Sequence, residues 1–126
     1  MSKTKLGRLQ TRIMQVLWER RRATAREITE TLNQEEEVAH STVQTLLRQL
    51  EEKGSLTHQV EERTFIYVPL VEQQSVAKSA TRELIERIFG GQASGLVSYL
   101  LKEEKIPPKE LEAIRKLIEE KEKRGK

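Results

Sequence analysis

The residues with the clearest chemical meaning lie on the outer face of a predicted helix that ends before Gly54. Apolar residues recur in this helix at i, i+3, i+4 and i+7, which predicts one buried face. They are Val43, Leu46, Leu47 and Leu50. The other face has hydrogen-bonding or cationic side chains and no acid: Ser41, Thr42, Gln44, Thr45, Arg48 and Gln49. Such side chains bind base edges and phosphates, so we predict that this face contacts DNA.

A shorter predicted helix precedes it and begins at a capping box. Thr24 is the N-cap and Glu27, three residues later, is its partner. The apolar stripe of this helix includes Ile28 and Leu32, and Asn33 is expected to end it. Two short helices joined by a turn are the arrangement with which a helix-turn-helix places its second helix in the major groove.

Two strand-like runs, 55–60 and 64–68, follow Gly54 and predict a hairpin whose tip is Glu61-Glu62-Arg63. Pro69 ends the second run, since proline cannot donate to a strand ladder. A first helix over residues 8–21 supplies a third wall. This order predicts a winged helix over residues 1–70. Arg63 is then either a wing residue that contacts DNA or an ordinary turn charge.

From residue 71 onward the pattern predicts helices only, over 72–89, 93–104 and from Pro107 onward, with a solvated charged tail after Glu119. Gly90-Gly91 ends the first of them. Three helices in about 55 residues cannot enclose their own apolar side chains, so we predict a dimerisation module over residues 71–126. Its predicted contact residues are Leu84, Ile88, Leu96, Val97, Leu100, Leu101, Leu111, Ile114, Leu117 and Ile118. The predicted fold class is mainly α with a small β-hairpin, a winged helix-turn-helix followed by a three-helix dimerisation module.

Composition excludes several other classes of protein. The 126 residues include no cysteine, no aspartate and two histidines, so we expect no metal, no cofactor and no enzymatic activity. The absence of a long apolar run and of a signal peptide predicts a cytoplasmic protein that does not insert into a membrane. The net charge of +3 does not by itself indicate DNA, but residues 1–22 contain seven basic residues against Glu19 alone.

Other interpretations stay open at this point. The polar helix face is an ordinary solvated surface in about one case in five, and His40 is either a helix-start residue or a phosphate contact. A winged helix that binds a protein instead of DNA has the same core, but its binding does not weaken steeply with salt. A hydrolase that uses His58 lacks a recognisable nucleophile and orienting acid. The acidic run 35–37 repels phosphates, so it is expected to point away from DNA.

The chain resembles the penicillinase-repressor (BlaI/MecI/CopY) family of bacterial regulators. The resemblance is carried by an ordered set of segments that covers nearly the whole chain: residues 6–17, 23–28, 38–47, 53–54, 65–70 and 89–91. It implies a homodimeric repressor of the antibiotic-response type that binds an inverted-repeat operator in double-stranded DNA. The positions His40, Ser41, Thr42, Gln44, Thr45 and Arg48 match the family's DNA-contacting surface.

The resemblance also implies that repression ends when the C-terminal module is cleaved, through a membrane-embedded sensor metalloprotease. The best-matched bond is Tyr99-Leu100, where the resistance repressors have asparagine and phenylalanine. The copper-sensing branch uses a C-terminal cysteine cluster. Since this chain has no cysteine, copper sensing by that chemistry is excluded.

Overall fold

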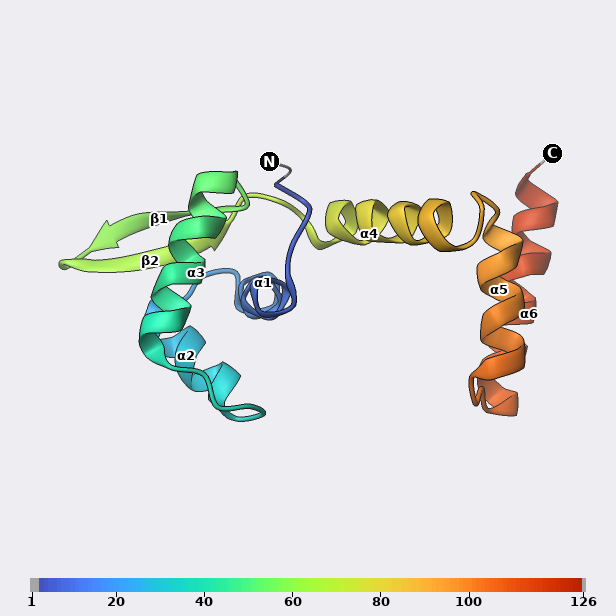
Figure 1. Ribbon diagram of the computed structural model, residues 1–126, viewed down its shortest axis with the longest axis horizontal. Coiled ribbons are helices and arrows are strands. Elements are labelled where there is room, and N and C mark those ends of the chain that lie inside the picture. The colour runs from blue at the N-terminus through green and yellow to red at the C-terminus, as the bar shows by residue number, and fades with distance from the viewer. Residues whose placement is uncertain (1–2, 126) are drawn as a thin grey trace. The chain divides into compact units, whose positions relative to one another are not determined.

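The computed structural model describes residues 3–125, and within them it contains six helices and a two-stranded antiparallel sheet (Figure 1). This order of elements confirms the predicted fold class. In chain order the elements are α1 (Arg8–Arg20), α2 (Ala25–Asn33), α3 (His40–Lys53), β1 (Leu56–Glu61), β2 (Thr64–Pro69), α4 (Gln73–Ile88), α5 (Ala93–Glu103) and α6 (Pro108–Arg124).

Local side-chain chemistry sets the bounds of α2 and α3. The Thr24 hydroxyl accepts a hydrogen bond from the Glu27 amide at 3.1 Å, and the Glu27 carboxylate accepts one from the Thr24 amide at 2.8 Å. This is the predicted capping box, and it satisfies two of the free N–H groups at the start of α2. Gly54 ends α3 in the left-handed region with φ of 88°, where a residue with a Cβ is disfavoured.

The core lies between the three N-terminal helices and the base of the hairpin. Its fully buried side chains come from all of these elements, with Ile13 and Leu17 on α1, Ile28 on α2, Leu47 on α3 and Leu56 on β1. Burial of a leucine or isoleucine side chain contributes about 1.5–3 kcal/mol, so these residues hold α3 against the other elements. The face of α3 that points outward is thereby fixed.

The hairpin pairs Leu56 with Pro69 at its base and Glu61 with Thr64 at its end. The tip is therefore a two-residue turn of Glu62 and Arg63, which is shorter than predicted because Glu61 belongs to β1. Both turn residues have positive φ, 50° and 68°. Two consecutive residues with positive φ match the right-handed twist of a hairpin.

The chain divides into two compact units, residues 1–82 and 83–126. The sequence predicts a boundary at residue 70, whereas Val71 and Val76 are buried with the winged-helix core. The indole N–H of Trp18 also donates to the Val71 carbonyl oxygen at 2.9 Å. The first turns of α4 are therefore part of the first unit. This unit consists of α1 to α3, the hairpin and the start of α4.

The second unit contains the end of α4, α5 and α6. Gly90 and Gly91 both have positive φ, which ends α4 after Ile88 as predicted. Residues 120–125 of the predicted charged tail are exposed as predicted, but α6 continues through them to Arg124. The residues there are glutamate, lysine and arginine, which have high helix propensity and favourable i, i+4 charge pairs, so a solvated run stays helical.

Candidate nucleic-acid interface

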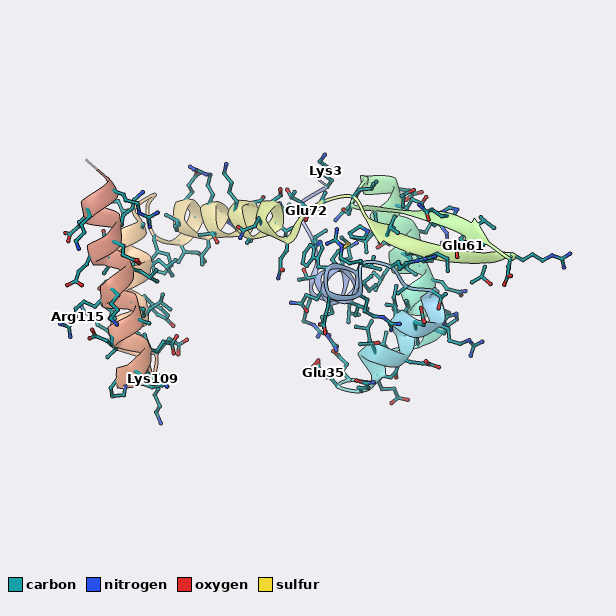
Figure 2. All side chains as sticks on the ribbon, turned by 180° about the vertical axis from the view of Figure 1, so that it is seen from behind. Lys3, Glu35, Glu61, Glu72, Lys109 and Arg115 are labelled. Carbon is teal, nitrogen blue, oxygen red and sulfur yellow. The ribbon has the colours of Figure 1, made fainter. Side chains whose placement is uncertain are left out.

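The structure places the predicted DNA-contacting residues of α3 on one exposed face. Ser41, Thr42, Gln44, Thr45 and Arg48 are all exposed. On the opposite side of the helix, three apolar side chains are completely buried: Val43, Leu47 and Leu50. The core therefore holds the helix in a rotation that presents only polar and cationic groups outward over residues 41–49, and the exposed Glu52 follows in its last turn. Figure 2 draws the side chains of the described residues on the ribbon.

Most hydrogen-bonding groups on this face are free to bind a ligand. Within residues 3–125, the side chains of Gln44 and Arg48 make no hydrogen bond or ion pair. The Thr45 hydroxyl donates to the Ser41 carbonyl oxygen at 3.1 Å and keeps its own lone pairs. A carboxamide and a guanidinium one turn apart are the groups that bind adenine and guanine edges in a bidentate manner.

His40 lies at the edge of this face and ties α3 to α2. Its Nδ1 is 2.9 Å from the Thr29 hydroxyl oxygen, and that hydroxyl donates its proton to the Ala25 carbonyl oxygen at 2.8 Å. Since the hydroxyl proton is already used, Nδ1 of His40 is the donor to Thr29. The ring is thus oriented by a hydrogen bond at the first residue of α3.

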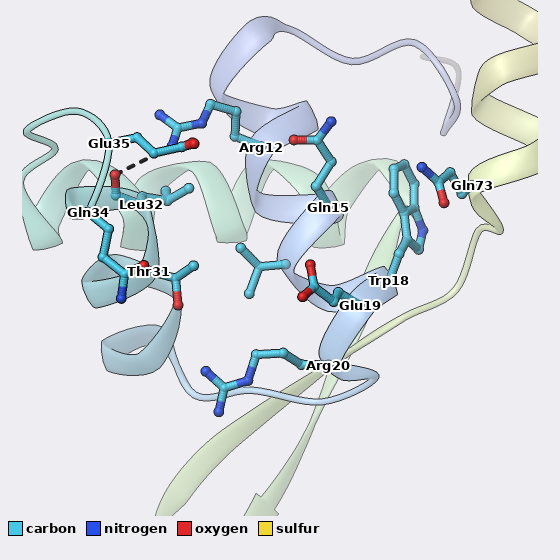
Figure 3. A pocket seen from close by; sticks show the side chains of 11 residues that line it. Arg12, Gln15, Trp18, Glu19, Arg20, Thr31, Leu32, Gln34, Glu35 and Gln73 are labelled. Carbon is cyan, nitrogen blue, oxygen red and sulfur yellow. Dashed lines mark hydrogen bonds and ion pairs between the residues drawn. The ribbon is translucent and has the colours of Figure 1, made fainter. Parts of the chain in front are cut away.

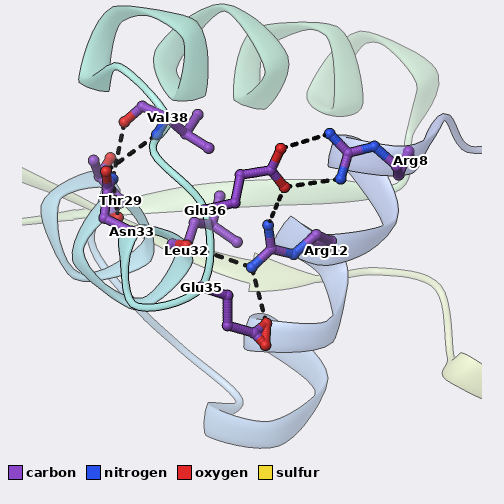
Figure 4. A network of polar contacts seen from close by, with 8 residues as sticks. All are labelled: Arg8, Arg12, Thr29, Leu32, Asn33, Glu35, Glu36 and Val38. Atoms are coloured by element: carbon purple, nitrogen blue, oxygen red, sulfur yellow. Dashed lines mark hydrogen bonds and ion pairs between the residues drawn. The ribbon is translucent and has the colours of Figure 1, made fainter.

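Most basic residues near the start of the chain form internal ion pairs. They are therefore not the free cations for DNA that the composition suggests. Arg8 binds both carboxylate oxygens of Glu36 at 2.8 Å. Arg12 binds Glu36 at 2.7 Å and Glu35 at 3.1 Å. Figure 4 shows this network. It occupies two arginines of α1 and two of the three acids that the sequence places in the turn before α3.

The same turn is held from the other side by Asn33. Its side-chain amide donates to the carbonyl oxygens of Thr29 at 2.7 Å and Val38 at 2.9 Å, and its carbonyl accepts from the Val38 amide at 3.1 Å (Figure 4). The residue that ends α2 therefore also shapes the turn. The turn between α2 and α3 is therefore held at two places. Glu35 and Glu36 bind arginines of α1, and Val38 binds Asn33.

The ion pairs have a consequence for acid stability. The Arg8 guanidinium lowers the pKa of Glu36 from its ordinary value of 4.5, with smaller help from Arg12. A carboxyl group with a lowered pKa stabilises the fold above its unfolded pKa, and this stabilisation is lost as the pH falls through the folded pKa. The contribution of Glu36 is therefore present at neutral pH and absent in acid.

We expect Glu36→Gln to lower the urea midpoint of unfolding at pH 7 by a small amount, since exposed ion pairs contribute little. As the pH falls through the lowered pKa of Glu36, the two midpoints should converge. The matched control is Glu37→Gln, which removes a neighbouring charge with no ion pair in the described part of the chain. A midpoint difference that persists in acid would contradict this role.

Sequence analysis missed one contact between α3 and the hairpin. His58 of β1 lies with Nδ1 2.8 Å and 2.9 Å from the two carboxylate oxygens of Glu51 on α3. Its ring is stacked on Phe65 of β2, with centroids 4.0 Å apart and planes 9° apart. No spacing rule predicts this, because Glu51 and His58 are separated by a helix end and belong to different elements.

Tyr67 lies beside this contact, near Arg48 on the exposed face of α3. Burial raises the pKa of its hydroxyl, the Glu51 carboxylate adds to the increase, and Arg48 acts in the opposite direction. The backbone of Tyr67 also pairs with Ala23, with N to O distances of 2.8 and 3.1 Å. The base of the wing is thus joined both to α3 and to the segment before α2.

Among residues 3–125, no group of three histidine or glutamate side chains is placed to hold a metal ion. An open groove of about 840 Å³ lies beside α1 and α2 (Figure 3). Its two arginines are already paired, Arg12 with Glu35 and Arg20 with Glu27 at 3.2 Å, so it offers no free cation to an anionic ligand.

The second unit presents a different kind of surface. In α5 and α6, all of whose residues the structure describes, no residue is buried. Ile88 is 64% exposed and Leu117 is 63% exposed. The other exposed residues of the predicted dimer contact are Leu84, Val97, Leu100, Leu101, Leu111 and Ile118, whereas Leu96 and Ile114 are partly covered. Exposed apolar side chains in this number are typical of association surfaces.

No described helix is long and apolar enough to cross a membrane.

The three helices, the hairpin and the outward face of α3 define a winged-helix protein. The family described as penicillinase repressor matches residues 6–120, so the chain belongs to that family. This confirms the resemblance seen in the sequence.

Individual relatives agree with the family assignment. The penicillinase repressor of Bacillus licheniformis is 25% identical, and the match covers 90% of this chain and 89% of that protein. The methicillin resistance regulatory protein MecI of Staphylococcus aureus strain N315 is 24% identical, over 86% of this chain and 89% of MecI. The solution structure of the DNA binding domain of the repressor BlaI matches with a TM-score of 0.52 and 27% identity, covering 58% of this chain and 90% of that one.

Proposed function

We propose that this protein is a bacterial transcriptional repressor that binds operator DNA through α3 and the wing. The observation that carries the proposal is the exposed face of α3, which has free Gln44 and Arg48 and no acid between residues 41 and 49. The names of its relatives describe repressors and a resistance regulator, which supports the same function. A repressor family also agrees with the prediction that the chain is not an enzyme. The cytoplasm is its proposed location, because operator DNA is there.

We propose in addition that the repressor acts as a homodimer through the second unit. The support is the set of exposed apolar side chains on α5 and α6, which a second copy of the same chain would cover. A twofold-symmetric pair of winged helices binds two half-sites related by the same symmetry. The operator is therefore proposed to be an inverted repeat, with half-site centres about 10 or 20 base pairs apart.

Relief of repression is proposed to follow cleavage of α5 at Tyr99-Leu100, with a membrane-embedded sensor metalloprotease as the partner. Both residues of this bond are exposed and lie in a regular helix. A helix without buried residues opens locally at low cost, which is the condition for access by a protease. The partner is proposed from the family resemblance alone.

The decisive experiment is recovery of DNA fragments from the organism's own genome with the purified chain. Enrichment of inverted repeats is the expected result, with log affinity falling linearly with log salt through counterion release. The matched control is Arg48→Ala. Affinity for a protein partner that shows little salt dependence, with no enriched DNA, would instead support a protein-interaction winged helix.

A substitution at the wing tip should separate stability from DNA binding. Arg63 has φ of 68°, and a left-handed conformation costs a residue with a Cβ about 1–2 kcal/mol. Glycine removes this cost but has more freedom in the unfolded chain, so Arg63→Gly should leave the free energy of unfolding unchanged or raise it by up to about 1 kcal/mol.

The same variant should weaken operator binding, because it removes a cation from the exposed tip. Affinity measured over a series of salt concentrations should show a log–log slope reduced by about one. Glu62→Gly is the matched control, since it relieves strain at the neighbouring residue and keeps the cation. Full operator affinity in Arg63→Gly would show that the wing tip does not touch DNA.

A further inference from the structure

One side-chain pair joins the recognition helix to the wing. Glu51 lies in the last turns of α3, and its two carboxylate oxygens are 2.8 and 2.9 Å from Nδ1 of His58 in β1. A carboxylate only accepts hydrogen bonds, so Nδ1 carries the proton and donates it. The side chains of Glu51 and His58 are 33% and 29% exposed, which places the pair at the edge of the core and not in it.

The contact continues through His58 to the tip of the wing. The His58 ring is stacked on Phe65, with centroids 4.0 Å apart. Phe65 immediately follows Thr64, which pairs with Glu61 to close the turn that contains Arg63. The series of contacts therefore runs from α3 to β1 and then to Phe65 of β2, two residues from Arg63.

The wing needs such a connection, since an isolated two-stranded hairpin is only marginally stable in water. Its inner half is held by the backbone pairing of Ala23 with Tyr67, which is the ladder partner of His58. Its outer half has little support, because Val60 is 61% exposed and Phe65 is 47% exposed. The ion pair of Arg22 with Glu61, at 2.5 Å, lies on the surface, where such pairs contribute little.

We propose that Glu51 and His58 are positioning residues that hold the outer half of the wing, and with it Arg63, at a fixed place relative to α3 on operator DNA. The proposal rests on the proposed function and names residues that do not themselves contact DNA. It explains why an acid lies on the recognition helix near phosphates. The carboxylate orients the wing instead of binding the ligand.

The charge of Glu51 makes the proposal testable by the sign of an effect. Removal of a negative charge near DNA strengthens attraction to phosphates if charge alone matters. Glu52 is the matched control, because it is the next residue of α3 and is exposed, and it makes no contact with His58. If Glu51 positions the wing, Glu51→Ala weakens binding whereas Glu52→Ala leaves it unchanged or strengthens it.

The first measurement needs no DNA. Backbone 15N relaxation of residues 61–64 is compared in the full chain and in Glu51→Ala, His58→Phe and Glu52→Ala. Phenylalanine preserves a stacked ring against Phe65 and removes only the hydrogen bond. The expected result is greater mobility of the tip in the first two variants, with unchanged amides in α1 and α3 and an unchanged tip in Glu52→Ala. A tip that is equally ordered in Glu51→Ala would overturn the proposal.

The second measurement is operator affinity at matched salt, at a temperature where circular dichroism shows every variant folded. Glu51→Ala and His58→Phe are each expected to lose about three- to tenfold in affinity. In an Arg63→Ala background this loss should disappear, because the wing no longer carries its contact. An equal loss in both backgrounds overturns the proposal. If the unaltered chain binds no DNA, the proposed function fails, whereas the relaxation result still decides whether the pair holds the wing.

Discussion

A chain that ends at Ser98 will bind operator DNA about 10²- to 10⁴-fold more weakly than the full chain, although its winged helix stays folded. This truncation removes the end of α5 and all of α6. It therefore deletes exposed apolar residues of the proposed dimer surface, including Leu101, Leu111 and Leu117. The core of the first unit lies entirely before the cut, with Val76 as its last buried residue.

The size of the expected loss follows from linkage of the two winged helices. In a dimer, docking of the first winged helix places the second at an effective concentration in the millimolar range, which adds affinity without any new contact. A monomeric fragment has only the contacts of a single α3 and wing. The fragment also represents the product of cleavage at the adjacent Tyr99-Leu100 bond, so its weak binding is the proposed basis of derepression.

The measurement is sedimentation together with operator binding at matched salt. The matched control is a chain that ends at Glu119, which loses only charged residues of α6 and retains Leu117 and Ile118. We expect the control to stay dimeric and to bind like the full chain, and the shorter fragment to be monomeric. A monomeric fragment with full operator affinity would refute both the linked-pair mechanism and the proposed route of derepression.

Most of the fold was predictable because its determinants are local. The capping box of Thr24 and Glu27 and the glycine after α3 act within a few residues, so they are visible in sequence. Apolar periodicity likewise predicted which face of α3 is buried, since Val43 and Leu47 recur with the helical repeat. The proposed DNA-contacting face is then the exposed side of the same helix over residues 41–48.

Contacts between distant residues were not predictable in the same way. Arg8 and Arg12 suggested a basic arm for DNA, but they bind Glu36 across more than twenty residues of chain. Charge composition cannot distinguish a free cation from a paired one. The stack of His58 on Phe65 was missed for a related reason, because hairpin register alone does not show that Glu51 of α3 reaches the strand.

The division of the chain shows a third limit. Sequence places the change at residue 70 because strand signals end there, whereas Val76 on α4 is buried with the first unit. A helix that begins in one unit and ends in another has one continuous periodic pattern. Its apolar residues do not reveal which unit covers them, and the burial of Val76 together with the hydrogen bond from Trp18 to the Val71 carbonyl assigns the first turns.

Arg48→Ala will cost about 1–3 kcal/mol of operator affinity and leave thermal stability unchanged. Arg48 is exposed on α3 and has no hydrogen bond or ion pair in the described residues, so its removal breaks none in the free protein. Its guanidinium lies one turn after Gln44, on the side opposite the buried Leu47. Both side chains therefore enter the same groove when the helix docks.

Arg48→Lys will tell whether this residue binds a base or a phosphate. Lysine preserves the charge but not the planar fork that binds guanine O6 and N7 together. If Arg48 binds guanine, the Arg48→Lys variant loses much of the operator affinity. Replacement of the contacted base pair then makes the affinities of the unaltered chain and of Arg48→Ala equal. If it binds a phosphate, Lys retains most affinity, and Ala weakens binding equally at every sequence.

The matched control is Arg115→Ala, which removes the same charge from α6, where Arg115 pairs with Glu112 at 3.2 Å. Loss of one positive charge from the whole chain changes long-range attraction in both variants, so only the difference between them reports the contact of α3. We expect Arg115→Ala to bind operator DNA like the unaltered chain. Equal operator affinities in the two alanine variants would show that α3 does not contact the operator, and the proposed function would then have no recognition surface.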